Sequence, residues 1–70
     1  MTRILIHTDY ITLSQFLKFS GAVETGGEAG DEIRAGQVLL NGEPCTVKGK
    51  KLYGGEVVTV YGEDYQVVKP

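Results

Sequence analysis

Two apolar patterns near the start of the chain predict a strand and a helix. Consecutive apolar side chains close to the N-terminus predict that residues 1–7 form one strand, at an edge of a sheet. Farther on, apolar side chains recur at a spacing of three and four positions, which predicts a short helix over residues 13–20. Thr12 and Gln15 match a capping box at the start of this helix, and Gly21 suits a left-handed cap at its end.

A second short helix is predicted to follow. Thr25 and Glu28 repeat the spacing of a capping box. Ala29 and Ile33 lie one helical turn apart, and Gly36 is a stop signal. Because helices of two to three turns are marginal in isolation, we expect the apolar sides of both helices to pack against a sheet.

The second half of the chain begins with a predicted hairpin. Asn41-Gly42, the dipeptide that best fits a type I′ turn, joins apolar residues 38–40 to a return strand over residues 43–47. Pro44 has no N–H to donate, so we expect the return strand to lie at an edge or to be irregular.

A final hairpin completes the predicted fold. Gly54-Gly55 interrupts the chain, and residues 57–60 and 65–68 are predicted to pair around a turn over residues 61–64. The sequence therefore predicts an α+β fold, in which two short helices pack on a small, mainly antiparallel β-sheet with hairpins.

Length and composition exclude several classes of protein. Seventy residues fit a single domain over residues 1–70 and exclude a two-domain enzyme. One cysteine, Cys45, and one histidine, His7, supply no usable set of metal ligands and no recognisable catalytic group, so we expect no metal, no cofactor and no enzyme. No apolar run is long enough for a signal peptide or a membrane span, and we expect a cytoplasmic protein with no membrane partner and no small-molecule substrate.

The charges are unevenly distributed. The formal net charge is −2 and the pI is near 5.2, so any nucleic-acid surface must be a local patch. The second predicted helix and its flanks hold four acids and one base, whereas residues 44–54 hold no acid and the bases Lys48, Lys50 and Lys51. The ammonium groups of these flexible lysines suit contact with phosphates, and the ring of Tyr53 suits stacking on a base. The alternative interpretation is a solvated loop whose lysines keep the domain soluble.

Three glycines lie near the predicted start of the second helix, where free N–H groups can hold a phosphate. The spacing of Gly26, Gly27 and Gly30 matches neither the dinucleotide fingerprint nor the P-loop, so a nucleotide-binding loop is not predicted. Two interpretations stay open: the glycines let the helix start close to another backbone of the protein, or they admit an RNA backbone.

The order of these motifs resembles the alpha-L RNA-binding motif, a domain named after the small-subunit ribosomal protein S-four. The resemblance covers about residues 12–60, most of the chain, and is nearest to the small stand-alone bacterial branch of that family. The segments that carry it are Thr12–Leu17, Gly21, Thr25–Ala29, Ile33, Gly36–Gly42 and Lys50–Val58.

The resemblance implies a module without chemistry of its own that holds structured RNA, ribosomal or transfer RNA, by backbone and shape. Ribosomal proteins are further candidate partners. The RNA-contact residues expected from the motifs and the resemblance together are Thr12, Thr25, Gly26, Gly27, Arg34, Gln37, Asn41, Lys48, Lys50 and Lys51. Family members often carry basic residues at four positions where this chain has Thr12, Gly26, Gly30 and Glu43.

An alternative hypothesis is a protein-interaction module of the same fold with little RNA affinity. The acids of the second predicted helix, Glu28, Asp31 and Glu32, would repel phosphates and attract a basic partner. Reversing these three charges separates the hypotheses, because it would abolish capture of a protein partner but leave RNA binding intact or improve it.

Overall fold

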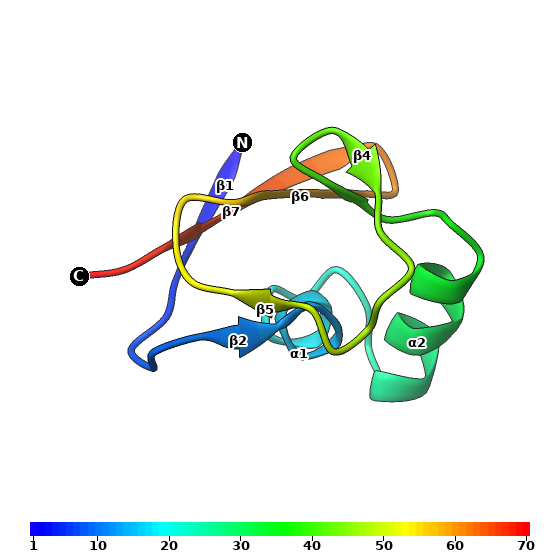
Figure 1. Ribbon diagram of the computed structural model, residues 1–70, viewed down its shortest axis with the longest axis horizontal. Coiled ribbons are helices and arrows are strands. Elements are labelled where there is room, and N and C mark those ends of the chain that lie inside the picture. The colour runs from blue at the N-terminus through cyan, green and yellow to red at the C-terminus, as the bar shows by residue number, and fades with distance from the viewer.

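Two helices and seven short strands follow one another in the computed structural model, which describes all 70 residues (Figure 1). The strands are β1 (Thr2–Leu5), β2 (Ile11–Thr12), β3 (Leu39–Leu40), β4 (Glu43–Pro44), β5 (Lys51–Leu52), β6 (Val57–Val60) and β7 (Glu63–Val68), and the helices are α1 (Leu13–Phe19) and α2 (Gly26–Arg34). The predicted α+β fold is therefore confirmed. No helix is long and apolar enough to cross a membrane.

The main sheet has five strands in the order β1-β7-β6-β3-β4. Its neighbours are antiparallel except for β1 and β7, which run parallel. Both predicted edge positions are confirmed, because β1 forms one edge and β4 forms the other. Strand β4 has no neighbour on its outer side, so no ladder hydrogen bond is lost there because Pro44 lacks an N–H.

The first hairpin forms as predicted, with a shorter return strand. Asn41 and Gly42 have φ angles of 51° and 86°, the left-handed values that a type I′ turn requires. The return strand β4 covers only Glu43–Pro44 of the predicted residues 43–47. One further cross-strand hydrogen bond follows, from the N–H of Cys45 to the carbonyl of Val38 at 3.0 Å, and the return segment then leaves the sheet.

The last hairpin has a tighter turn than the sequence indicated. Tyr61 and Gly62 alone form it, with φ angles of 53° and 74°, whereas a four-residue turn was predicted. Glu63 already belongs to β7 and pairs with Val60. The prediction was wrong because Glu63 and Asp64, although polar and exposed, continue the strand and pair with Val60 and Thr59.

The predicted capping box of α1 is confirmed. The Thr12 hydroxyl accepts a hydrogen bond from the Gln15 N–H, and the Gln15 side-chain oxygen accepts one from the Thr12 N–H. The helix ends at Phe19, one residue earlier than predicted, and Ser20 is the C-cap.

The capping box predicted for α2 is only half present. The Thr25 hydroxyl accepts from the Glu28 N–H at 3.1 Å, as expected. The Glu28 carboxylate instead accepts from the N–H of Glu24 and from the hydroxyl of Tyr61 at 2.9 Å. The local bond is thus shifted by one residue, from Thr25 to Glu24, and the second carboxylate oxygen bonds to Tyr61 in the distant β6–β7 turn.

Apolar side chains from the main sheet, both helices and β5 meet in one core. Figure 1 shows both helices on one side of the main sheet, which is the packing that the sequence predicted. The buried apolar residues are Ile6, Leu13, Phe16, Leu17, Val23, Ala29, Ile33, Val38, Leu52, Val58, Val60 and Val67.

A second, two-stranded sheet was not predicted. Strands β2 and β5 pair antiparallel, with Ile11 opposite Leu52 and Thr12 opposite Lys51. The side chain of Leu52 is fully buried, so hydrophobic burial holds β5 against the rest of the domain. Lys51 consequently lies in a strand and not in the flexible loop that the sequence indicated.

The carboxylate of Glu56 closes the connection between β5 and β6. It accepts hydrogen bonds of 2.7 Å from the backbone N–H groups of Tyr53 and Gly54. Partial burial raises the pKa of Glu56, but the hydrogen bonds from these backbone N–H groups and the charge of Lys69 lower it. The net result is a pKa below the ordinary value of 4.5.

The substitution Glu56→Gln is expected to lower the free energy of unfolding by about 1 kcal/mol near neutral pH. The two hydrogen bonds are charge-assisted, but solvent screens this largely exposed group. Because the folded-state pKa is lowered, the carboxylate stabilises the fold above its unfolded-state pKa and loses this contribution as the pH falls through its folded-state pKa.

Urea unfolding of both proteins at neutral and acidic pH measures the effect. The difference between them should shrink as the pH falls below 4.5. A difference that stays constant across this range would contradict the assignment.

Candidate nucleic-acid interface

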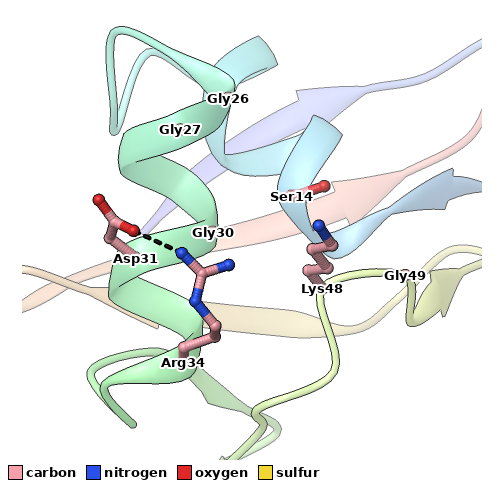
Figure 2. A pocket seen from close by; sticks show the side chains of 8 residues that line it. All are labelled: Ser14, Gly26, Gly27, Gly30, Asp31, Arg34, Lys48 and Gly49. Carbon is pink, nitrogen blue, oxygen red and sulfur yellow. Dashed lines mark hydrogen bonds and ion pairs between the residues drawn. The ribbon is translucent and has the colours of Figure 1, made fainter.

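A polar cleft of about 370 Å³ opens between the N-terminal end of α1, one side of α2 and the turn that precedes β5. Figure 2 shows Arg34 and Lys48 reaching into it from opposite walls. No hydrophobic residue lines it. The lining residues are Ser14, Gly26, Gly27, Gly30, Asp31, Arg34, Lys48 and Gly49.

Backbone hydrogen bonds fix the wall that carries Lys48. The N–H of Leu13 donates to the carbonyl of Lys50 at 2.8 Å, and the N–H of Ser14 donates to the carbonyl of Lys48 at 3.1 Å. These donors belong to the first turn of α1, where N–H groups have no partner within the helix. The N–H groups at the start of α1 thus hold residues 48–50 in place.

The opposite wall is the glycine-rich side of α2. A Cβ atom added to Gly26 would meet nothing within 4 Å, and one added to Gly27 would only touch the Thr25 hydroxyl at 3.9 Å. Packing within the protein therefore does not require glycine at these two positions. Of the two interpretations left open by the sequence, this space favours close approach by a ligand.

Gly30 has a different role, because it makes room for the arginine. A Cβ atom at this position would lie 3.1 Å from Nη1 of Arg34. The Arg34 side chain therefore folds back over Gly30 along the same face of the helix. This places the guanidinium in the cleft instead of beyond the end of α2.

The cleft carries more positive than negative charge. Arg34 pairs with Asp31 at 2.5 Å, and the two side chains are 60% and 72% exposed, so the pair contributes little to stability. Lys48 makes no ion pair. One unpaired ammonium, a guanidinium and two exposed glycines in an open polar cleft form a surface suited to a phosphate group.

The structure brings together four of the ten predicted contact residues. Gly26, Gly27, Arg34 and Lys48 all line the cleft. Thr12 and Thr25 flank it as the N-caps of the two helices, and their hydroxyl oxygens accept from backbone N–H groups. These two threonines thus position the walls.

The other four predicted residues lie outside the cleft. Gln37 lines a separate hollow beside the β6–β7 turn, and the side-chain oxygen of Asn41 accepts from the Val57 N–H at 2.9 Å. Lys50 is exposed on the segment that follows Gly49. The ammonium of Lys51 sits over the ring of Tyr10.

Four lining residues were not among the predicted contacts, and one of them is Gly30, which makes room for Arg34. Ser14 follows the cap of α1, Asp31 lies three residues before Arg34, and Gly49 follows Lys48. The spacing of Asp31 and Arg34 on one helix face was the only local signal available. Ser14 and Gly49 carry no signal of their own, because they reach the cleft only through tertiary packing.

The acids of α2 do not form one surface. Asp31 faces the cleft and is paired with Arg34, whereas Glu28 and Glu32 lie near the turn residue Tyr61. The hydrogen bond to Glu28, reinforced by partial burial and by the charges of both glutamates, raises the pKa of Tyr61 to about 12. Tyr61 therefore remains a hydrogen-bond donor at neutral pH.

Residues 4–68 match the S4 domain, and the chain belongs to this family of RNA-binding domains. The resemblance inferred from the sequence motifs is thereby confirmed. The chain is also 44% identical, over 66 residues that cover 93% of each protein, to the probable ribosome maturation protein RlbA of Bacillus subtilis (strain 168).

Proposed function

We propose that this chain binds structured RNA, ribosomal or transfer RNA, through the sugar-phosphate backbone and shape of the RNA, without catalysing a reaction. The observation that carries the proposal is the polar cleft, in which Arg34 and the exposed glycines of α2 form one wall and Lys48 faces them from the other. One phosphate group would lie between the two cations. The neighbouring Lys50 would contact the RNA strand where the RNA leaves the cleft.

We further propose that the chain acts in ribosome maturation in the cytoplasm, where ribosomal proteins would be its neighbours. Membership of the S4 domain family and the name of the Bacillus subtilis relative support this process. The overall acidity of the chain supports recognition of a particular folded RNA, because the net charge of −2 disfavours indiscriminate binding to polyanions.

A binding titration tests the proposal. The purified protein is titrated against total structured bacterial RNA and against a DNA duplex, each at two salt concentrations. We expect tighter, salt-sensitive binding to RNA, because each phosphate contact releases condensed counterions. Absence of RNA binding even at low salt would overturn the proposal and favour the protein-interaction hypothesis.

Charge reversal at Glu28, Asp31 and Glu32 tests that second hypothesis directly. Glu28 is already bonded to Tyr61 and Asp31 is already paired with Arg34, which weakens the case for an acidic docking surface. Under the RNA-binding proposal, the reversal leaves RNA affinity intact or raises it.

A further inference from the structure

The two-stranded sheet of β2 and β5 has one face toward the core and carries aromatic and basic side chains on the other. Leu52 is fully buried, and Ile11 opposite it is half-buried. Side chains alternate across a strand, so Lys51 and Tyr53, which flank Leu52, lie on the outer face. Extending the register by one pair places Tyr10 opposite Tyr53.

The two tyrosines and the lysine form an ordered surface that faces solvent. The ring centroids of Tyr10 and Tyr53 are 6.0 Å apart with the rings tilted by 54°, a favourable aromatic geometry. The ammonium nitrogen of Lys51 lies 4.8 Å from the centroid of the Tyr10 ring. Tyr10 and Tyr53 are nevertheless 41% and 54% exposed, so much of their ring surface is free to contact a ligand.

A hollow of about 610 Å³ borders Tyr10 on its other side, next to α1. Lys18 and the 63% exposed Phe19 contribute to it, and no carboxylate does. The acid nearest along the chain, Asp9, does not line the hollow, and the ammonium of Lys69 donates to its backbone carbonyl oxygen and not to its carboxylate. The lining residues of the hollow are Thr8, Tyr10, Ile11, Gln15, Lys18 and Phe19.

One short segment of the chain leads from the polar cleft to this surface. The segment of residues 48–51 begins in the cleft at Lys48 and ends on the outer face of the two-stranded sheet at Lys51. Its backbone is held against the start of α1 by the hydrogen bonds from Leu13 and Ser14. Figure 1 shows β5 directly beside β2, with α1 next to them. A basic strip thus joins the cleft to the tyrosines.

We propose that Tyr10, Tyr53 and Lys51 bind an unpaired nucleotide of the same RNA whose backbone lies in the cleft. Exposed tyrosine rings offer a stacking surface to any base, and the neighbouring ammonium suits the phosphate of that nucleotide. The absence of carboxylates from the adjoining hollow matches an anionic ligand. This inference rests on the proposed RNA-binding function. It adds that the protein binds the RNA where a base-paired segment meets an unpaired one.

The test compares two fluorescein-labelled probes, a blunt RNA duplex and the same duplex with unpaired uridines at its ends. Tyr10→Leu and Tyr53→Leu are expected to weaken binding of the second probe roughly fivefold to hundredfold, as loss of one stacked base does, and to leave binding of the blunt duplex unchanged. Tyr61→Leu is the matched control, because Tyr61 is 55% exposed but lies on the β6–β7 turn. It should bind both probes like the parent.

A cleft variant separates failure of this inference from failure of the proposed function. Lys48→Ala should weaken binding of both probes, since both contain the paired backbone. If Lys48→Ala weakens both and the tyrosine variants weaken neither, the stacking site is refuted and the cleft stands. If the parent binds both probes and no variant changes either affinity, both the cleft and the stacking site are refuted. If the parent binds neither probe, the RNA-binding function itself is refuted. Circular dichroism confirms folding, and equal loss on both probes in the tyrosine variants would also overturn the stacking assignment.

Discussion

Alanine at both Arg34 and Lys48 is expected to weaken RNA binding roughly thirtyfold near physiological salt. The two cations flank one phosphate group, and each neutralised phosphate releases about 0.9 counterions, so the slope of log affinity against log salt should fall by about 0.9. The fold should survive, because both side chains are exposed and the ion pair of Arg34 with Asp31 contributes at most about 1 kcal/mol. Titrations over a series of salt concentrations measure both quantities.

The double variant Arg3→Ala and Lys69→Ala provides a charge-matched control. It changes the net charge by the same amount, but Arg3 lies on the edge strand β1 and Lys69 follows β7, away from the cleft. This control should keep the parent's salt slope within the change expected for distant screened charges. An equal loss of affinity in the two double variants would show that overall charge, and not the cleft, determines binding.

Glutamate at Gly27 is expected to stabilise the fold while it weakens RNA binding at least tenfold. Replacing a helical glycine raises the free energy of unfolding by about 0.5 to 1 kcal/mol, and an acid in the first turn of α2 adds a favourable interaction with the helix dipole. A Cβ atom at this position meets only the Thr25 hydroxyl, at 3.9 Å, so the backbone accommodates the branch point of a side chain. Its carboxylate, however, enters the cleft that a phosphate would occupy. Thermal unfolding and RNA titration together measure these opposite changes.

The variant Gly27→Lys is the control for Gly27→Glu. Gly27→Lys adds a side chain of similar length with the opposite charge, so it should retain RNA binding or strengthen it. Equal losses in both variants would assign the effect to steric blocking of the cleft and not to charge. RNA binding like that of the parent in Gly27→Glu would exclude the glycine wall from the interface.

The helices and the turn of the first hairpin were predictable because their signals are local. Thr12 and Gln15 exchange hydrogen bonds across three positions, and Asn41-Gly42 adopts the positive φ angles of a type I′ turn. The fully buried Phe16 and Ile33 follow from the spacing of apolar residues alone. None of these features depends on a distant part of the chain.

Pairing between distant segments was not predictable. Strands β2 and β5 contain two residues each and lack a distinctive pattern, and they pair because Leu52 is buried in the shared core. The bond of the Glu28 carboxylate to Tyr61, 33 positions away, was likewise not predictable. Both contacts form only when segments far apart in the sequence meet in the fold.

The sequence by itself determined the kind of chemistry that this protein offers: capped helix starts, exposed glycines and a short run of lysines, all of them suited to phosphate groups. Only the tertiary structure decided which residues share a site. Lys48 enters the cleft because the first turn of α1 binds the carbonyl oxygens of its segment, and Lys51 leaves it because β5 pairs with β2. The physical reason is that caps and turns form within a few residues, whereas burial of the common core sets how distant segments meet.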